Sequence, residues 1–393
     1  MKITTKITKA FAAAAAVITM ATATVNLTAS ATQIRTDGVG GVYCTAYNSD
    51  IDLEEPNKIT GSNWMSCLPD DKPLNEISIP GAHDASTAKV TGGMSYFAQT
   101  QDLYFDELLN SGVRYFDLRI YRENNELYMC HGSVNCKDRN KNDLKLQSVI
   151  GDMEDFLQKN PEETIILQVK CDRDDNNADG RTFKYFKDLA DEGKVYCGDF
   201  NMTLGETRGK FVIFSRLDFG DNTCQDDYRF NEDGSGWNYW ALDVHKFKMG
   251  DEKNYTMAKT ADALGIEVWT EDAFKETKSS KWAYVNLSLT GNKSAAVRRD
   301  EAKAKDKAAW SIIYSSMSRQ DFGNTICNIL DRLSGGIFHF ENGIVLPKEG
   351  SMYINPRLIN LLKNNSDMFT GCLVCDYITA DIASLIYTTN FNA

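Results

Sequence analysis

Short strand-like runs alternate with helical patterns through most of this 393-residue chain. The strand-like runs are rich in β-branched and aromatic residues, and turn residues bound most of them. They lie at residues 76–79, 113–121, 164–170, 210–218, 266–270, 283–289 and 371–379. Alternation predicts parallel strands joined by crossover helices, and this many strands over about 310 residues favour a closed barrel over an open sheet. We therefore expect an α/β fold built as an irregular TIM-type (β/α)8 barrel.

Helical patterns fill several of the gaps between these runs. They lie at residues 146–160, 180–193, 297–310 and 354–365. Pro161 follows the first and Gly193 closes the second, which are typical stop signals. In the last segment Asn355 is the expected N-cap and Pro356 the first helical residue. These segments supply the crossover helices that a parallel barrel needs.

The beginning of the chain has the pattern of a secretory signal peptide. Lys2, Lys6 and Lys9 precede the apolar run "AFAAAAAVITMATATV", and small residues offer a cleavage point near Ala31. We expect a signal peptide at residues 1–31, an N-terminal extension at 32–75 packed on the barrel, and a single barrel domain at 76–393. The mature protein is expected to be secreted.

Composition narrows the possible partners. The chain has 55 acidic and 43 basic residues and a net charge of −12. We expect no nucleic-acid partner, because phosphates demand clustered Lys and Arg. Ten cysteines in an exported chain allow disulfides. A bridge between Cys130 and Cys136 stays open, whereas Cys372 and Cys375 should point to opposite faces of one strand.

Ionisable side chains are expected to gather at the C-terminal rim of the barrel, where such folds carry their chemistry. The turn after the first strand delivers His83 and Asp84 to this rim. Asp117 and Arg119 lie two residues apart in the next strand and therefore share a face. A short hairpin then leads to His131, and the last strand ends at another carboxylate. The groups expected at the rim are His83, Asp84, Asp117, Arg119, His131 and Asp376.

The order of these motifs resembles a known family. "SIPGAHD", "GVRYFDLRIY", "YMCHG" and "ETIILQVK" are similar to the catalytic half of the bacterial phosphatidylinositol-specific phospholipases C. The likeness continues through "FVIFSR", "EVWTEDAF", "YVNLSL", "YINPRLI" and "CLVCDYIT", over about residues 74–380 with an insertion near 291–350. It implies an enzyme, a phosphatidylinositol diacylglycerol-lyase of the phosphoric diester hydrolase group. Its products would be diacylglycerol and inositol 1,2-cyclic phosphate.

The resemblance also assigns the acid–base groups. It implies that His83 is the general base for the inositol 2-hydroxyl, oriented by Asp376. His131 would be the general acid that protonates the departing diacylglycerol oxygen, with Asp117 as its partner. The resemblance places Asp84 beside the leaving group.

Phosphate and inositol contacts follow from the same comparison. Arg119 would hold the phosphate oxygens. Lys170, Arg216 and Asp272 match residues that bind the inositol hydroxyls. Phe274 stands where the bacterial family has a tyrosine that stacks on the inositol ring, so the stacking is retained and the phenol hydrogen bond is lost.

The arginine also bears on metal use. Calcium-dependent eukaryotic relatives carry a carboxylate at the position of Arg119, and a guanidinium neutralises a phosphate without an ion. We expect no metal and no cofactor. "DDNNADG", residues 174–180, begins like a calcium loop, but Phe186 takes the twelfth position, which requires a bidentate Glu. A solvated polar loop is the preferred interpretation.

The expected partner is a membrane that contains phosphatidylinositol, bound peripherally and transiently by a monomer. Met94, Tyr96 and Phe97 are candidates for insertion, and packing on the barrel is the equal alternative. Residues 234–243 form a second aromatic candidate. GPI-anchored proteins remain an open substrate class. Two other functions stay open: a glycerophosphodiester-type phosphodiesterase of the same superfamily, and a non-catalytic lipid- or glycan-binding barrel.

Overall fold

A computed structural model describes the chain in ten segments. They are residues 34–36, 42–44, 57–91, 95–173, 177–218, 225–229, 238–244, 258–261, 265–318 and 345–392. The chain divides into two compact units, Met1–Ile59 and Thr60–Ala393. The expected signal peptide lies outside the described residues.

The first unit contains a small antiparallel sheet. Its strands are β1 (Ile34–Thr36), β2 (Val42–Cys44) and β3 (Asn57–Ile59), in that spatial order.

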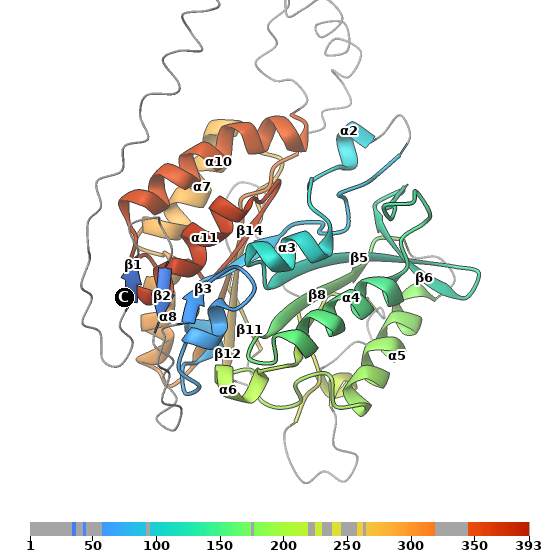
Figure 1. Cartoon of the computed structure of the whole chain (residues 1–393), viewed down its shortest axis with the longest axis horizontal. Coiled ribbons are helices and arrows are strands. Elements are labelled where there is room, and N and C mark those ends of the chain that lie inside the picture. The colour runs from blue at the N-terminus through green and yellow to red at the C-terminus, as the bar shows by residue number, and fades with distance from the viewer. Residues whose placement is uncertain are drawn as a thin grey trace, which may run out of the picture. The chain divides into compact units, whose positions relative to one another are not determined.

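Parallel strands form the centre of the second unit (Figure 1). Those described are β4 (Ile79–Ala82), β5 (Tyr115–Glu123), β8 (Ile165–Cys171), β9 (Phe211–Ser215), β10 (Leu242–Asp243), β12 (Ile266–Glu271), β13 (Ala308–Tyr314) and β14 (Cys372–Cys375). Their spatial order is β10-β9-β8-β5-β4-β14-β13-β12, and β11 (Ala258–Ala261) adds an antiparallel edge beside β12. β6 (Glu126–His131) folds back on β5 and continues into β7 (Val134–Asn135). The predicted series of parallel strands is confirmed.

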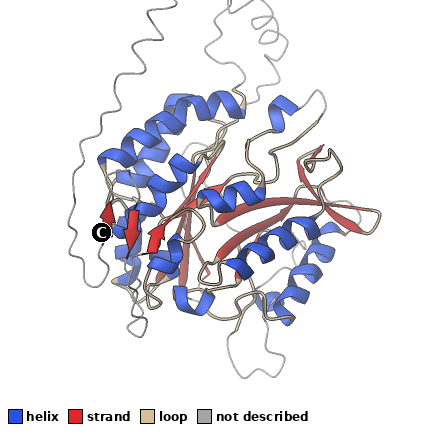
Figure 2. Cartoon of the chain, viewed as in Figure 1, coloured by secondary structure: helices blue, strands red, loops and turns tan. Residues whose placement is uncertain are grey.

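Helices connect and flank these strands (Figure 2). The α-helices are α2 (Ser95–Ala98), α3 (Phe105–Ser111), α4 (Leu146–Lys159), α5 (Ala178–Asp191), α6 (Leu204–Thr207), α7 (Lys278–Thr290), α8 (Ala295–Lys303), α10 (Pro347–Asn364) and α11 (Ala380–Thr388). The 3-10 turns are η1 (Trp64–Cys67), η2 (Leu74–Glu76), η4 (Gln225–Tyr228) and η7 (Thr389–Phe391). α4 shows why such segments are helical: Val149, Met153 and Phe156 recur at helical spacing and are buried.

One predicted strand is wrong. Residues 283–289 belong to α7, which begins after Thr277, whose side chain accepts a hydrogen bond from the Ser280 amide. The run alternates apolar residues as a strand does, but Leu287 is 40% exposed whereas Val285 and Leu289 are buried. Helical spacing therefore determines which apolar side chains reach the core.

Two helix boundaries also differ from the predictions. The helix expected to begin at Asn355 begins at Pro347, and Pro356 lies inside it. The helical pattern predicted over 297–310 ends at Lys303, and β13 begins at Ala308. A proline is favourable at the first helical position, and Pro347 rather than Pro356 takes it.

The first strand of the barrel lies later than predicted. β4 includes Pro80 and Gly81 and pairs with β14 and β5. The turn that carries His83 and Asp84 therefore follows this strand directly. A Cβ atom at Gly81 would lie 3.0 Å from a methyl group of Val374 and 3.2 Å from Cβ of Tyr115. The neighbouring strands thus approach closely, and a side chain at this position would require them to shift by a few tenths of an ångström.

Residues 60–75 pack within the second unit. Trp64 is fully buried, stacks on Tyr387 with ring centroids 5.4 Å apart, and donates a hydrogen bond from Nε1 to the Gly112 carbonyl. The expected domain boundaries at residues 31 and 75 remain predictions.

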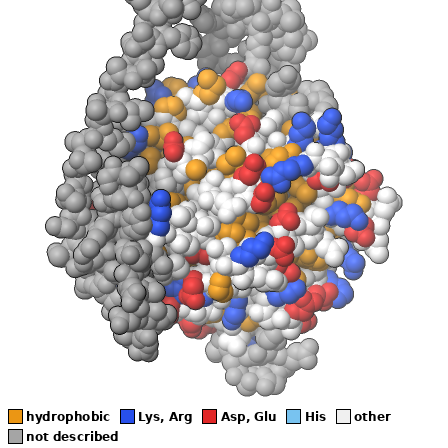
Figure 3. Space-filling model, viewed as in Figure 1, with side chains coloured by type: hydrophobic (Ala, Val, Ile, Leu, Met, Phe, Trp, Pro, Cys, Tyr) orange, Lys and Arg blue, Asp and Glu red, His pale blue; other side chains and the backbone are white. Residues whose placement is uncertain are grey.

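The surface of the described residues carries both signs of charge. Acidic and basic side chains are interspersed over the face in Figure 3. No helix of the described part of the chain is long and apolar enough to cross a membrane.

Candidate active site

A cavity of about 520 Å³ lies at the C-terminal ends of the parallel strands. Most of the predicted site residues line it. They are His83, Asp84, Arg119, His131, Lys170, Arg216, Asp272, Phe274 and Asp376. Asp117 is fully buried, and its carboxylate accepts a hydrogen bond from Arg119 of this set. The structure therefore brings together all of the residues predicted to act.

His83 is held between two neighbouring strands. It follows β4, and its amide donates a hydrogen bond to the Cys375 carbonyl at the end of β14. Its Nδ1 atom lies 2.7 Å from Oδ1 of Asp376, which confirms the predicted contact. The edge of the ring packs against Tyr314 at 5.7 Å between centroids. These contacts fix the ring and leave Nε2 for the cavity.

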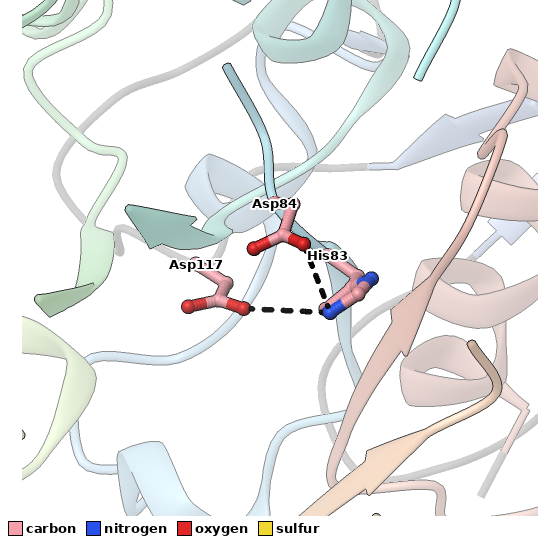
Figure 4. Close-up of side chains that lie close together, drawn as sticks. All are labelled: His83, Asp84 and Asp117. Carbon is pink, nitrogen blue, oxygen red and sulfur yellow. Dashed lines mark ion pairs between the residues drawn. The ribbon is translucent and has the colours of Figure 1, made fainter. Parts of the chain in front are cut away.

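Carboxylates control the charge of His83. Burial alone lowers the pKa of this imidazole, but the charges of Asp84 and Asp376, with a smaller effect from Asp117, raise it to about 10. Figure 4 shows Asp84 and Asp117 on the Nε2 side of the ring. The carboxylates therefore favour the charged form of the imidazole, which is the form that a general base reaches once it has accepted a proton.

Asp84 lies between the two histidines. Its Oδ2 atom is 3.4 Å from Nε2 of His83 and 3.2 Å from Nε2 of His131. The residue has φ of 41°, a left-handed conformation that is uncommon for a side chain other than glycine. Several hydrogen bonds hold the turn, among them those from the Ala85 amide to the Asp117 carbonyl and from the Thr87 hydroxyl to the Asp84 carbonyl. A strained backbone that neighbouring contacts enforce is common at functional sites.

Asp117 and Arg119 form a two-point ion pair. Both carboxylate oxygens of Asp117 accept from the guanidinium at 2.8 Å, and Gln168 donates a third hydrogen bond at 3.0 Å. Burial raises the pKa of Asp117, but Arg119 and His83 outweigh this effect and hold it well below its usual range. Asp117 is therefore ionised and orients the arginine.

The same groups bear on metal binding. His83, Asp84 and Asp117 offer ligand atoms within 4.8 Å of one another. However, Nε of Arg119 lies 2.8 Å from Asp117 and 3.2 Å from Asp84. A cation at this place would compete with the guanidinium for both carboxylates.

His131 has different partners from those predicted. It ends β6, and its Nδ1 atom lies 2.8 Å from the Ala98 carbonyl, which only accepts hydrogen bonds, so Nδ1 carries the hydrogen. Nε2 faces Asp84, whereas the predicted partner Asp117 pairs with Arg119. The left-handed turn at Asp84 brings that carboxylate between the rings.

Asp172 also belongs to the site, although it was not among the predicted residues. This residue follows β8, its side chain is 8% exposed, and Oδ1 lies 2.7 Å from Nζ of Lys170 and 3.2 Å from Nη1 of Arg119. Burial raises the pKa of Asp172, but the two cations outweigh it and lower the pKa well below its usual range. The signal in the sequence was the two-residue spacing from Lys170, which places both side chains on one face of the strand.

The other predicted inositol-binding residues line the same cavity as Lys170. Arg216 follows β9, and Asp272 and Phe274 follow β12. Burial raises the pKa of Asp272, although Lys281 opposes this shift. Phe274 is 36% exposed, as a stacking surface must be.

The structure describes only some of the residues predicted to contact a membrane. Met94 lies outside the described residues, as does the side chain of Tyr96, and Phe97 lines the cavity. Of the candidate segment 234–243, Tyr239 and Trp240 are buried, so they are core residues and the prediction of exposure is wrong for them.

Other predictions concern loops and cysteines. Residues 174–176 of the predicted polar loop lie outside the described residues. Ala178, Asp179 and Gly180 are the first residues of α5, and Ala178 and Asp179 are buried, so the interpretation as a solvated loop is wrong for these positions. Cys130 and Cys136 are both free thiols.

A parallel α/β barrel with two histidines, an arginine and several carboxylates at one rim defines a class of proteins suited to acid–base chemistry on an anionic group. Residues 71–217 match the family "Phosphatidylinositol-specific phospholipase C, X domain". This part of the chain is therefore similar to the X domain of that family, and the resemblance predicted from the motifs is confirmed.

Known relatives agree with this assignment. A 1-phosphatidylinositol phosphodiesterase of Staphylococcus aureus (strain Newman) is 27% identical over 348 residues, covering 86% of this chain and 94% of the relative. The corresponding protein of Listeria monocytogenes is 35% identical over 169 residues, covering 40% of this chain and 50% of the relative. Solved structures of the S. aureus phosphatidylinositol-specific phospholipase C include one with a TM-score of 0.61 at 24% identity, covering 84% of this chain and 97% of the other. The predicted barrel fold is confirmed by this likeness.

Proposed function

We propose that this protein is a phosphatidylinositol-specific phospholipase C that produces diacylglycerol and inositol 1,2-cyclic phosphate by acid–base catalysis without a metal. One observation carries the proposal: Nε2 of His83 and Nε2 of His131 face the same oxygen of Asp84, beside the guanidinium of Arg119. Two imidazoles and a cation around one point suit a phosphodiester, which needs a base, an acid and charge neutralisation.

The nucleophile in this mechanism belongs to the substrate. His83 takes the proton of the inositol 2-hydroxyl, which lies next to the phosphate on the ring. Intramolecular attack of this kind reaches effective molarities of about 10⁵ M or more. Asp376 holds Nδ1 of His83 and stabilises its charged form, as a buried carboxylate does for a catalytic imidazole.

The leaving group departs on the opposite side of the phosphorus. His131 gives its Nε2 proton to the diacylglycerol oxygen, and Asp84 lies within reach of that proton. Arg119, held by Asp117, neutralises the phosphate oxygens with a fixed fork of donors. Hydrolysis of the cyclic product is a slower second step through the same two histidines with their roles exchanged.

The headgroup pocket gives the proposed specificity. Lys170, Arg216 and Asp272 supply donors and an acceptor for the inositol hydroxyls, and Phe274 supplies an apolar face for the ring. The GPI anchor contains the same inositol phosphate linkage and belongs to the proposed substrate class.

Secretion and transient peripheral binding to membranes complete the proposal. The leader pattern at residues 1–31 supports export. The relative from S. aureus has been studied for its membrane binding, and Phe97, which lines the cavity, supports a similar approach here. The protein is proposed to act as a monomer.

Phosphorus NMR of the reaction with phosphatidylinositol vesicles tests the proposed activity. A cyclic phosphodiester signal should appear first and inositol 1-phosphate later. Cleavage of glycerophosphodiesters in preference to phosphatidylinositol, or binding without turnover, would contradict the proposal and favour the two alternative functions.

A further inference from the structure

Both backbone polar groups of Gly132, its amide and its carbonyl, are held by the two residues that follow β8. The Gly132 amide donates to Oδ2 of Asp172 at 2.9 Å, and the Gly132 carbonyl accepts from Nε of Arg173 at 2.7 Å. Gly132 directly follows His131 and has φ of 55°, in the left-handed region where glycine is favoured. Without partners, this glycine would leave the end of β6 free to move.

The two holding residues are themselves fixed. Arg173 donates a second hydrogen bond, from Nη2 to Oδ1 of Asn135 at 2.7 Å, and its guanidinium stacks over Tyr121 at 4.1 Å. The hairpin that carries His131 is therefore tied to the end of β8 and to the outer part of β5 by one side chain.

Asp172 connects the same hairpin to the cations of the cavity. Its Oδ1 atom contacts Nζ of Lys170 at 2.7 Å and Nη1 of Arg119 at 3.2 Å, while Oδ2 receives the Gly132 amide. A single carboxylate thus sets the spacing between the proposed phosphate-binding arginine and the strand end that carries the proposed acid. The charge-assisted character of these contacts makes them stronger than neutral hydrogen bonds.

We propose that Asp172 and Arg173 are positioning residues for His131, so that the general acid reaches the leaving oxygen while the phosphate rests on Arg119. This inference rests on the proposed function. Neither residue is required to touch the substrate. Their effect is on the placement of the imidazole, whose other anchor is the hydrogen bond from Nδ1 to the Ala98 carbonyl.

Leaving-group dependence separates positioning of the acid from general damage. Arg173→Ala and Asp172→Asn should lower kcat on phosphatidylinositol about tenfold to a hundredfold, since a displacement of about 1 Å costs this much. With a nitrophenyl inositol phosphate, whose leaving oxygen departs unprotonated, Arg173→Ala should lose little activity. Asp172→Asn should lose more on this substrate than Arg173→Ala, because it also releases Arg119 and Lys170.

The chain offers a matched control and a conservative variant. Arg139 also stacks on a tyrosine, at 4.2 Å from the Tyr104 ring, and bonds Asp106 at the surface. Arg139→Ala should therefore leave the activity ratio of the two substrates unchanged. Arg173→Lys retains the charge and places its donors on a single nitrogen, so it should recover part of the lost turnover and serves as the test variant if Arg173→Ala does not fold.

A second measurement does not depend on turnover. The imidazole ¹⁵N and ¹H signals of His131 at fixed pH should shift in Arg173→Ala and stay unchanged in Arg139→Ala. Equal losses of Arg173→Ala on both substrates, or His131 signals in Arg173→Ala identical to those of the wild type, would overturn the inference. Failure of the wild-type protein to cleave phosphatidylinositol would instead remove the proposed function, and the NMR comparison would still decide whether Arg173 positions His131.

Discussion

Nδ1 of His83 lies 2.7 Å from Oδ1 of Asp376, although 293 positions of sequence separate the two residues. The contact exists because β4 and β14 are parallel neighbours and end together, with Ala82 paired to Cys375. Each residue comes directly after its strand. The pair is therefore a product of strand register, and it determines which nitrogen of His83 faces the cavity.

The first prediction concerns the charge of His83. The carboxylates raise its pKa to about 10 from an ordinary value of 6.5, so the native state binds more protons than the unfolded state between these values. The free energy of unfolding gained from His83 should be complete below pH 6.5 and should be lost as the pH rises through about 10. Asp376→Asn should lower the NMR titration midpoint of His83 and narrow this window. An unchanged midpoint would show that Asp376 does not control the imidazole.

The second prediction separates the two histidines. His83→Ala or His131→Ala should each lower turnover of phosphatidylinositol about 10²–10⁴-fold, and the double variant should be scarcely worse than either. On the nitrophenyl substrate His131→Ala should recover, because that leaving oxygen needs no acid, whereas His83→Ala should remain inactive. Equal recovery of both variants would reverse the assignment of acid and base.

The third prediction concerns the headgroup. Arg216→Ala and Asp272→Ala should reduce the preference for phosphatidylinositol over phosphatidylcholine by more than about tenfold, because polar groups built for the inositol hydroxyls penalise other headgroups when left unpaired. Competition assays with mixed vesicles would measure the ratio of kcat/KM. A variant that kept the wild-type ratio would show that its residue does not contact the headgroup.

The fourth prediction concerns metal. Turnover should persist in EDTA and show a bell-shaped pH profile that belongs to the histidine pair. The reason is that Arg119 already contacts the carboxylates of Asp117 and Asp84, where a cation would bind. Activity lost on chelation and restored by calcium would be the contrary result. Arg119→Asp is the variant in which calcium dependence is expected to appear.

The fifth prediction concerns stability beneath the headgroup pocket. Nζ of Lys281 lies 2.7 Å from Glu271, and both side chains are almost fully buried. Lys281→Met should cost about 3–5 kcal/mol of unfolding free energy, because it leaves a buried carboxylate without a partner. Glu271→Gln in the same chain should restore much of this loss while retaining an acceptor for the Ala273 amide. Denaturant unfolding of the three proteins would show whether the pair behaves in this way.

The sequence alone determined the alternation of strands and helices and the residue types at the strand ends. The helix at Leu146–Lys159 and the strand at Tyr115–Glu123 follow from local periodicity, which neighbours in the sequence create. The same patterns identified His83, Arg119 and His131, because strand-end position is a property of a single segment. Local periodicity gave the wrong prediction in α7, because its apolar run fits both a strand and a helix. Burial against the barrel decides that this segment is helical.

Tertiary structure decided which side chains meet. Asp117 was expected beside His131, but the left-handed backbone at Asp84 brings Asp84 between the imidazoles and leaves Asp117 to Arg119. Asp172 joins the site only because β8 pairs with β5 in a register that places Lys170 opposite Arg119. Register and single-residue backbone conformations depend on packing across the sheet, so no segment of the sequence encodes them by itself.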